Sequence, residues 1–587
     1  MPISPGVSYI FLHALDVAFP PAAIYCVYGL IGEPGYEHIP QPLKSPLGLV
    51  LLILAYTICQ TVFTRIWRNV ALNRDMWRLG PQPLPMVKGK GWPGNVDIAL
   101  RLSKGFKGEY AGGTFISLMQ ENGDTFCLDI LGSKMLWTCN PYYVKEIFAV
   151  QFQNFVKGPT FQGLFDSFLG TGIFNSDGDA WKLHRSMTRP FFNRDRITDF
   201  DIFEHHSRIL LEKIREKSEN GVAFDFQDAI SQFTMDSATE FLLGKSVNSL
   251  ATPLSLPGAT SSDLGVNRFV SAFQATQKHI ASRARSKLVP WQLREVMGDP
   301  TQKDMVTMYT FIDPIIDAAL VKAKARGNDS EPTAGQEGET LLSLLVAETQ
   351  DRKMIRDELL NILLAGRDTT ASNLTWNIYF LATHPLVMSR LRQEILDIVG
   401  PNQRPTFDQI KGMTYLRAVI NESLRVLPSV PFNMKCAVES TTFTNPKTGT
   451  KYFIPAGSRI GISLLAMHTN PAFWGPTAHQ YDPERWLNDR NKTYYLANPF
   501  IFLPFLAGPR ICLGQQFAYN EISFFLIRFL QQFEQIELAP DAHPPGTLPP
   551  AEWKTHPSSG TRAAYEKVWP KSDITTYSYG GMWIRVN

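Results

Sequence analysis

The most constraining feature of this sequence is a ten-residue stretch near its end, Phe505-Leu506-Ala507-Gly508-Pro509-Arg510-Ile511-Cys512-Leu513-Gly514. One cysteine lies in a short segment rich in glycine, and a phenylalanine stands seven residues before it. Glycine adopts positive φ without steric penalty, so Gly508 and Gly514 are expected to let the backbone turn and approach the sulfur. The stretch therefore predicts a tight loop built around one sulfur atom.

A helix is expected to leave this loop directly, because apolar residues recur every three or four positions from Gln515 to Leu526. The positive end of its dipole would favour an ionised cysteine. We interpret Cys512 as the thiolate ligand of a haem iron, with Phe505 covering the sulfur and Arg510 pairing with a haem propionate. The alternative for an isolated cysteine is a buried structural residue in a glycine turn.

The stretch resembles the haem-binding signature of the cytochrome P450 family, F-x-x-G-x-R-x-C-x-G, with every fixed position filled. The resemblance extends over residues 80 to 587, where four motifs follow the family's order. It implies a mostly α fold with small β-sheets and haem b (iron protoporphyrin IX) with Cys512 as the axial ligand. Phe505, Gly508, Arg510 and Gly514 would then surround the cofactor.

A second motif lies in a predicted long helix from Met354 to Leu381, which contains no proline and is apolar on most of its circumference. At its middle, Ala365-Gly366-Arg367-Asp368-Thr369-Thr370 resembles the family's oxygen-activating sequence, (A/G)-G-x-(D/E)-T. The resemblance implies that the Thr369 alcohol hydrogen-bonds oxygen and that Asp368 relays protons to it. Without a haem beside it, such a sequence would be a solvated patch of helix.

Two further segments carry candidate haem contacts. Trp181 and Arg185 share one face of a predicted helix, and the W-x-x-x-R pattern resembles the family's propionate-binding helix. Cation–π packing between the two side chains is the alternative explanation. Lys435 stands on a predicted strand where the family commonly has a propionate-binding arginine, and its ammonium lacks the bidentate fork.

A structural triad is expected from Glu422, Arg425 and Arg485. The first two form an E-x-x-R pair on one helix face, and Arg485 lies in the segment Pro483-Glu484-Arg485-Trp486. In the family the corresponding residues form a buried charge cluster on the haem side of the core.

The N-terminal region predicts a membrane anchor. From Pro46 to Phe63 no residue is charged, close to the ~20 residues that cross a bilayer. Four arginines follow within residues 65–78, which places the rest of the chain in the cytosol. The apolar segment from Val7 to Ile31 carries Asp16 and a Pro-Pro pair, and it stays open as a second span, a re-entrant or an interfacial segment. We expect an anchor over residues 1–79, a Pro/Gly-rich hinge over 80–96 and a catalytic domain over 97–587.

The composition argues against a nucleic-acid-binding protein and against a disulfide-rich protein. Lys and Arg number 57 against 54 Asp and Glu, a net charge of only +3, which gives no support for binding nucleic acid. The six cysteines are too few and too scattered for a disulfide scaffold. Apart from Cys512, they are expected to be reduced thiols without metal-ligand spacing.

Two other segments are expected near the substrate. The apolar residues Phe161 to Leu169 correspond to a part of the family fold that roofs the substrate pocket. Near the C-terminus, Asp573–Tyr579 and Gly580–Val586 predict two strands joined by a Gly-Gly turn, and the tip of such a hairpin could line the pocket.

The resemblance implies a monooxygenase that inserts one atom of O2 into an apolar substrate. Electrons would come from a membrane-bound NADPH–cytochrome P450 reductase, with cytochrome b5 as a second candidate donor, at the endoplasmic reticulum membrane.

The sequence also resembles the microsomal fungal branch that includes alkane and fatty-acid hydroxylases. Terpenoids and polycyclic aromatic compounds of secondary or xenobiotic metabolism stay open as substrates. Alternatives are a haem-thiolate isomerase or dehydratase that uses no O2, which the Asp368-Thr369 pair argues against, and a non-catalytic membrane protein that binds haem or lipid.

Overall fold

The computed structural model describes residues 4–11, 81–192, 200–258, 267–286, 289–326, 340–555 and 561–587, together with scattered residues between 48 and 78. Most of the predicted span from Pro46 to Phe63, and most of the apolar segment from Val7 to Ile31, lies outside these residues. Within the described part of the chain, no helix is both long enough and apolar enough to cross a bilayer.

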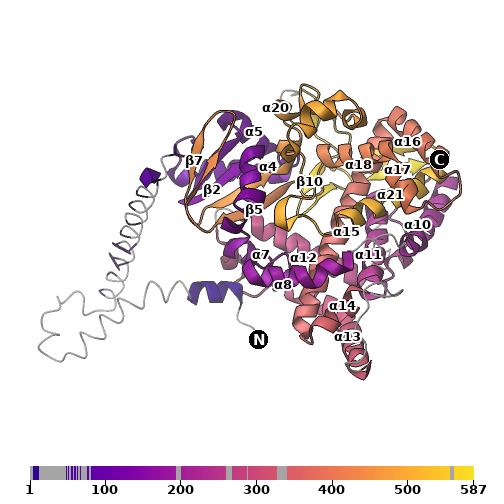
Figure 1. Ribbon diagram of the computed structural model, residues 1–587, viewed down its shortest axis with the longest axis horizontal. Coiled ribbons are helices and arrows are strands. Elements are labelled where there is room, and N and C mark those ends of the chain that lie inside the picture. The colour runs from indigo at the N-terminus through magenta and orange to yellow at the C-terminus, as the bar shows by residue number, and fades with distance from the viewer. Residues whose placement is uncertain are drawn as a thin grey trace, which may run out of the picture.

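Helices make up most of the described chain, as the sequence predicts (Figure 1). Their bounds are α4 Val96–Gly108, α5 Gly113–Asn122, α6 Pro141–Lys145, α7 Gly158–Leu169, α8 Gly178–Thr188, α10 Asp201–Glu219, α11 Phe226–Leu243, α12 Arg268–Arg285, α13 Gln302–Arg326, α14 Leu341–Glu348, α15 Arg352–Thr383, α16 Pro385–Ile398, α17 Phe407–Gly412, α18 Thr414–Val426, α19 Leu464–His468, α20 Pro471–Trp474 and α21 Gln515–Gln532.

The strands form small sheets. They are β1 Thr125–Ile130, β2 Ser133–Thr138, β3 Phe155–Val156, β4 Phe224–Asp225, β5 Phe432–Ala437, β6 Thr441–Thr444, β7 Lys451–Ile454, β8 Arg459–Ser463, β9 Ile536–Leu538, β10 Pro570–Ser572, β11 Thr576–Ser578 and β12 Trp583–Val586. The largest sheet has the order β1-β2-β8-β5-β3, with only β2 and β8 parallel. Figure 1 shows β2 and β5 on the same side of the molecule as α4 and α5, while most helices lie on the other side.

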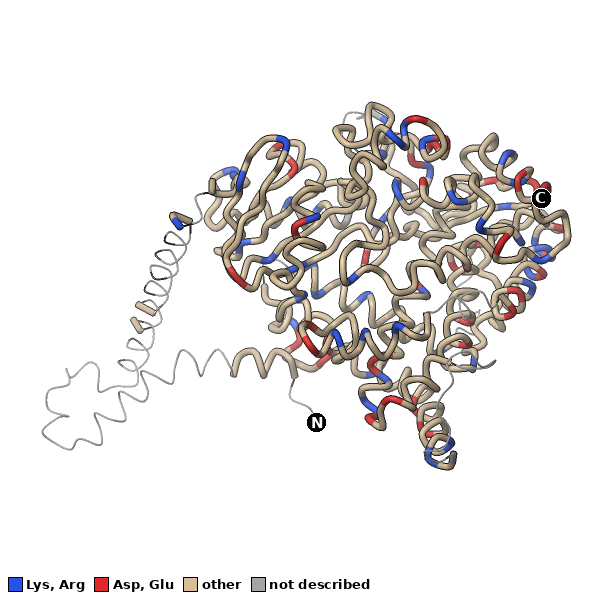
Figure 2. The backbone as a smooth tube through the Cα atoms, in the orientation of Figure 1, with Lys and Arg blue, Asp and Glu red and all other residues tan. Residues whose placement is uncertain are grey.

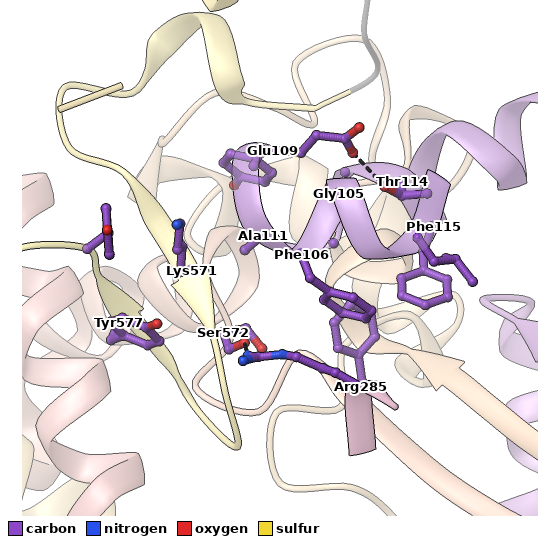
Figure 3. A pocket seen from close by; sticks show the side chains of 16 residues that line it. Gly105, Phe106, Glu109, Ala111, Thr114, Phe115, Arg285, Lys571, Ser572 and Tyr577 are labelled. Atoms are coloured by element: carbon purple, nitrogen blue, oxygen red, sulfur yellow. Dashed lines mark hydrogen bonds between the residues drawn. The ribbon is translucent and has the colours of Figure 1, made fainter. Parts of the chain in front are cut away.

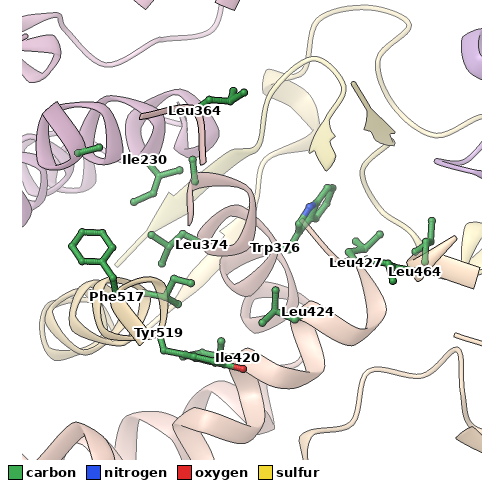
Figure 4. Packing of buried hydrophobic residues seen from close by; sticks show 14 of the residues in the cluster. Ile230, Leu364, Leu374, Trp376, Ile420, Leu424, Leu427, Leu464, Phe517 and Tyr519 are labelled. Carbon is green, nitrogen blue, oxygen red and sulfur yellow. The ribbon is translucent and has the colours of Figure 1, made fainter. Parts of the chain in front are cut away.

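Helix α15 runs through the core and confirms the helix predicted from Met354 to Leu381. Asp351 begins it, because its carboxylate accepts hydrogen bonds from the backbone N–H groups of Lys353 and Met354. Figure 4 shows Leu374 of α15 among apolar side chains from α11 and α21, and Trp376 near α18. From Ile355 to Leu381 the helix is buried on nearly all sides, but it is less apolar than its sequence suggested, because the buried residues include polar and charged side chains such as Glu358 and Arg367.

Helix α21 begins at Gln515, directly after the cysteine loop, as the sequence predicts. Its first turns pack through Phe517, whose ring lies 4.4 Å from that of Phe241 on α11.

The aromatic segment expected near the substrate forms α7, and Phe168 packs edge-on against Phe273 of α12, with ring centroids 5.5 Å apart. Figure 2 shows basic and acidic residues interspersed over the described chain, consistent with its near-neutral charge.

The predicted C-terminal hairpin is wrong in its pairing. Strand β11 pairs with β10 through a turn at residues 573–575, while β12 pairs with β4 and β9. Gly580 and Gly581 do have positive φ, but the chain after them is held elsewhere, because the N–H of Met582 donates to the carboxylate of Asp225. These partners come from distant parts of the sequence, so the local Gly-Gly pattern could not identify them.

Candidate functional site

The cysteine loop is tight, as its sequence predicts. The N–H of Cys512 donates to the carbonyl of Phe505 over 3.0 Å and so closes the loop. Gly508 has a φ of 68°, and a Cβ there would lie 1.8 Å from the carbonyl oxygen of Phe148. Gly514 does not have the expected positive φ, since its φ is −85° and an added Cβ would make its nearest contact at an ordinary 3.7 Å, but its backbone N–H does approach the sulfur of Cys512. Only Gly508 needs to be glycine for steric reasons.

The side chain of Cys512 is exposed to a cavity of about 830 Å³. The cavity lies between the cysteine loop and the end of α8, where Trp181 and Arg185 line it. Burial raises the pKa of the Cys512 thiol to about 11, while the N–H of Gly514 and the charge of Arg185 lower it. The free thiol therefore keeps its proton at neutral pH, and a metal bound there must release that proton.

The predicted aromatic and cationic neighbours surround this loop. The ring of Phe505 lies 5.1 Å from that of Tyr519 on α21. Arg185 donates to the carbonyl of Ile511 over 3.1 Å. The indole of Trp181 lies between two guanidinium groups, 4.7 Å from that of Arg510 and 5.7 Å from that of Arg185. Helix α8 is thus tied to the cysteine loop by one hydrogen bond and by stacked cations.

Arg510 has partners that the sequence did not reveal. Its Nη2 donates to the carbonyl of Ser176 over 2.7 Å and to the carboxylate of Asp177 over 2.8 Å. The same carboxylate accepts hydrogen bonds from the backbone N–H groups of Lys157 and Gly158, each over 2.9 Å. Asp177 therefore joins the cysteine loop to the start of α7.

Lys435 is the most unusual residue of this region. It lies on β5 with only 2% of its surface exposed, and its Nζ makes no hydrogen bond within the described part of the chain. Burial and repulsion by Lys157 and Arg510 hold the pKa of Lys435 well below its usual value, although Asp177 acts in the opposite sense. For Lys157, burial and the charge of Arg510 lower the pKa to about 7.

This cluster fits a doubly anionic ligand. Among the described residues, Lys157, Lys435 and Arg510 share one nearby carboxylate, that of Asp177. A buried ammonium without a partner is unfavourable unless a ligand supplies the missing charge and hydrogen bonds. The two propionates of a haem have the charge and the acceptor oxygens for this role. Lys157 and Asp177 were not predicted, because neither belongs to a recognisable motif.

A short face in the middle of α15 is accessible, between two buried stretches of the helix. Ala365, Gly366 and Thr369 are part-exposed, and a Cβ added to Gly366 would meet no atom within 4 Å. The hydroxyl of Thr369 donates to the carbonyl of Ala365 over 2.6 Å. A threonine that bonds the carbonyl four residues earlier commonly loosens the helix ladder. The face therefore offers open space beside a hydroxyl group, as the motif predicts.

Asp368 is not on this face. It is buried and forms an ion pair with the adjacent Arg367. Burial raises the pKa of Asp368, and the charge of Arg367 opposes that change. The structure thus brings Thr369, but not Asp368, to the accessible side of the helix.

Three elements meet at Thr369. Its backbone carbonyl accepts a hydrogen bond from the hydroxyl of Ser429 over 2.9 Å, just before β5. The carbonyl of Ser429 accepts one from the N–H of Thr576 on β11 over 2.9 Å. Thr576 in turn accepts a bond of 2.7 Å at its carbonyl from Ser372, one helical turn after Thr369. The β10–β11 hairpin is therefore fixed against the accessible face of α15.

Glu422, Arg425 and Arg485 lie together and are fully buried. Arg425 donates two hydrogen bonds of 2.8 Å to Glu422, and Nε of Arg485 lies 3.4 Å from the same carboxylate. Burial alone would raise the pKa of Glu422, but Arg425 and Arg485 hold it below its usual value. Trp486 also donates to Glu422 over 3.0 Å. Loss of one member would leave buried charge unpaired, at a cost of about 3–5 kcal/mol.

Comparison with known families gives one match over most of the chain. The family model described as Cytochrome P450 matches residues 105–558. The chain is 36% identical over 489 residues to cytochrome P450 52A9 of Candida maltosa, covering 81% of this chain and 91% of that protein. It is also 36% identical over 522 residues to cytochrome P450 52-M1 of Starmerella bombicola, covering 86% of this chain and 94% of that protein.

A third relative is the cytochrome P450 monooxygenase g430 of a Fusarium species, at 36% identity over 84% of this chain and 86% of that protein. Among solved structures, the haem domain of cytochrome P450DA superposes with a TM-score of 0.65 at 20% identity, over 86% of this chain and 97% of that one. A cytochrome P450 named CYP102L1 also gives 0.65, at 22% identity, over 86% of this chain and 99% of that one. These two structures have the same fold as this chain.

Proposed function

We propose that this chain, which belongs to the cytochrome P450 family, hydroxylates a long apolar substrate, with fatty acids and alkanes as the first candidate class. The chain is a cytochrome P450 monooxygenase, and proteins of this family bind haem b through a cysteine thiolate. One atom of O2 enters a C–H bond of the substrate and the other leaves as water. The reaction consumes two electrons and two protons.

The observation that carries the proposal is the environment of Cys512. Its sulfur opens into a cavity, and Arg510 of the same loop belongs to a cluster of cations that includes the buried Lys435. A haem would be held by Cys512 on the iron and by Lys157, Lys435 and Arg510 at its propionates, with Trp181 and Arg185 alongside. When bound, the haem supplies the oxygen chemistry. The protein supplies the ligand charge, the orientation and the exclusion of water.

Thr369 and Asp368 are proposed to handle protons. The hydroxyl of Thr369 borders the open space at Gly366, and it can accept a hydrogen bond from water there while it donates to Ala365. Asp368 is one residue away, and its raised pKa suits an acid that gives and regains a proton. Because Asp368 pairs with Arg367, delivery of its proton requires that this ion pair open.

The cellular setting is part of the proposal. The uncharged run from Pro46 to Phe63 supports an anchor in the endoplasmic reticulum membrane, with the catalytic domain in the cytosol. NADPH–cytochrome P450 reductase, with cytochrome b5 as a second candidate, would then deliver electrons from the same membrane. Arg185 and Arg189 line the cavity beside Cys512 and offer positive charge to an acidic donor protein on this face.

The test is substrate screening of the full-length protein in microsomes that contain the reductase. Dodecane, dodecanoate, a terpenoid and a polycyclic aromatic compound are compared by the spectral shift on binding, by NADPH and O2 consumption, and by product analysis. We expect hydroxylated dodecane or dodecanoate. Product formed without O2 would support an isomerase or dehydratase, and a haem spectrum without any product would support a non-catalytic binder.

A further inference from the structure

A second pocket, of about 330 Å³, is shown in Figure 3. It is bordered by α4 and α5, the last residue of α12, the start of β5 and the β10–β11 hairpin. Aromatic rings form much of its wall, and they are Phe106, Tyr110, Phe115, Phe432, Tyr577 and Tyr579. None of its lining residues lines the cavity at Cys512. An aromatic wall of this kind suits an apolar chain.

Hydrogen bonds connect the wall of this pocket to Thr369. Phe432, which lines the pocket, is the third residue after Ser429, whose hydroxyl bonds the carbonyl of Thr369. On the hairpin, Lys571 and Tyr577 pair across the two strands, and Thr576 is hydrogen-bonded to Ser429. The same hairpin therefore contributes to the pocket wall and to the surroundings of the accessible face of α15.

Two cations border the pocket, Arg285 from α12 and Lys571 from β10. The Nη2 of Arg285 donates to the carbonyl of Ser572 over 2.6 Å and also pairs with Asp573. Its Nε and Nη1 form no hydrogen bond with the residues that the structure describes, and its side chain is 34% exposed. Arg285 thus keeps two donor atoms for an anion in the pocket.

The ammonium of Lys571 is held between two aromatic rings. Its Nζ lies 3.7 Å from the ring centre of Tyr579 and 4.4 Å from that of Trp569. Burial and the charge of Arg285 lower the pKa of Lys571, and the charge of Asp573 opposes them. This lysine and Arg285 are close enough to repel one another, so an anion between them would relieve that repulsion.

The one carboxylate that lines the pocket is turned away from these cations. Glu109 accepts a hydrogen bond of 2.6 Å from the hydroxyl of Thr114, and Figure 3 shows this pair on the opposite side of the pocket from Arg285. The contact depends on Gly105, where an added Cβ would lie only 1.8 Å from the Thr114 hydroxyl. Glu109 is therefore held away from Arg285.

We propose that Arg285 and Lys571 bind the carboxylate of a fatty-acid substrate at the mouth of the active site and so direct its opposite end towards Thr369. The inference rests on the proposed function and narrows its substrate class to chains with an anionic head. Charge-assisted hydrogen bonds to a carboxylate are stronger than neutral ones, and this pocket offers them at one end only. Such an anchor favours oxidation at the end of the chain remote from the carboxylate.

The test compares dodecanoate with its methyl ester, which has the same chain without the charge. Binding is read from the spectral shift of the full-length haem-loaded protein in microsomes, and the retained reduced-CO band checks that each variant is folded. Loss of one charge-assisted bond predicts about a tenfold weaker Kd for dodecanoate in Arg285→Gln and in Lys571→Gln. The ester should bind each variant as it binds the original protein. The control Arg268→Gln, at the exposed start of the same helix, should change neither ligand.

In a third variant the affinity for dodecanoate should increase rather than decrease. Asp573→Asn removes the carboxylate that competes for Arg285, so dodecanoate should bind more tightly while the ester is unaffected. A merely structural role of the hairpin would weaken both ligands in all three variants, and that result would overturn the anchor. Unchanged dodecanoate binding in Arg285→Gln and Lys571→Gln would also overturn it, while leaving the fatty-acid class intact. If the original protein bound neither dodecanoate nor its ester, the fatty-acid class and the anchor would fail together.

Discussion

Arg510 and Asp177 form a hydrogen-bonded ion pair of 2.8 Å that joins the cysteine loop to the segment before α8. The pair is mostly buried, since the two side chains are 10% and 17% exposed. Because Asp177 also binds the backbone N–H groups of Lys157 and Gly158, one carboxylate orders three segments around the propionate cluster. Asp177 therefore fixes the arrangement of the cysteine loop relative to the starts of α7 and α8.

Removal of this carboxylate should destabilise the protein. Asp177→Ala leaves the Arg510 guanidinium and two backbone donors without their shared carboxylate acceptor, so we expect the free energy of unfolding to fall by about 1–3 kcal/mol. Urea unfolding of the haem-loaded protein measures this change. The control Asp179→Ala removes an exposed carboxylate that pairs only with Lys182 at the surface, and it should leave the unfolding midpoint unchanged. Equal midpoints for the two variants would contradict the role given to Asp177.

Lys157 and Lys435 predict that the stability of the haem-free protein depends on pH. The pKa values of Lys157 and Lys435 in the folded state lie below the ordinary 10.5, that of Lys157 at about 7. Between about pH 7 and 10.5 the unfolded chain therefore binds more protons than the folded chain, and stability rises with pH. Below this window the desolvation cost of charging the lysines is fully present.

The urea midpoint of the haem-free protein at pH 7, 8 and 9 checks this sign. Lys435→Met should have a higher urea midpoint than the original protein at pH 7, because the buried charge is gone. Its midpoint should also rise less steeply between pH 7 and 9. The exposed Lys182→Met serves as the control and should keep the original slope. In the haem-loaded protein, Lys435→Met should instead release haem to apomyoglobin faster. A urea midpoint that falls as the pH rises from 7 to 9 would refute the lowered pKa values of Lys157 and Lys435.

Thr369→Ala should leave haem binding intact and uncouple the reaction. Without the hydroxyl beside the open face of α15, protons reach the site less selectively, and more of the NADPH consumed should appear as hydrogen peroxide. Product and peroxide formed per NADPH are the measurements. Thr383→Ala is the matched control, because Thr383 lies on the same helix and makes the same bond to the carbonyl four residues earlier. Undiminished coupling in Thr369→Ala would show that its hydroxyl takes no part in proton delivery.

The elements that the sequence predicted correctly are those with local signals. The glycine-rich cysteine loop and the proline-free helix α15 each carry their pattern within one continuous segment. The same holds for α21, whose apolar residues recur with helical spacing from its first turn. The motif also located the accessible face at Gly366 and Thr369.

What the sequence missed depends on contacts between distant segments. Lys157 and Asp177 become a functional pair only when α7, α8 and the cysteine loop meet, and no local pattern marks either residue. Strand β12 pairs with β9 and β4 rather than with β11, because Asp225 holds the chain after Gly581. The buried position of Asp368 likewise follows from how α15 is rotated in the core, which a four-residue motif does not specify.

The most direct test of the central claim is the reduced-CO difference spectrum of Cys512→Ser. We predict that the original protein shows the band typical of a haem-thiolate protein and that the variant loses it. Cys436→Ser, which replaces a half-buried cysteine on β5, should keep the band. A thiolate band that survives in Cys512→Ser would contradict the assignment of this sulfur as the iron ligand.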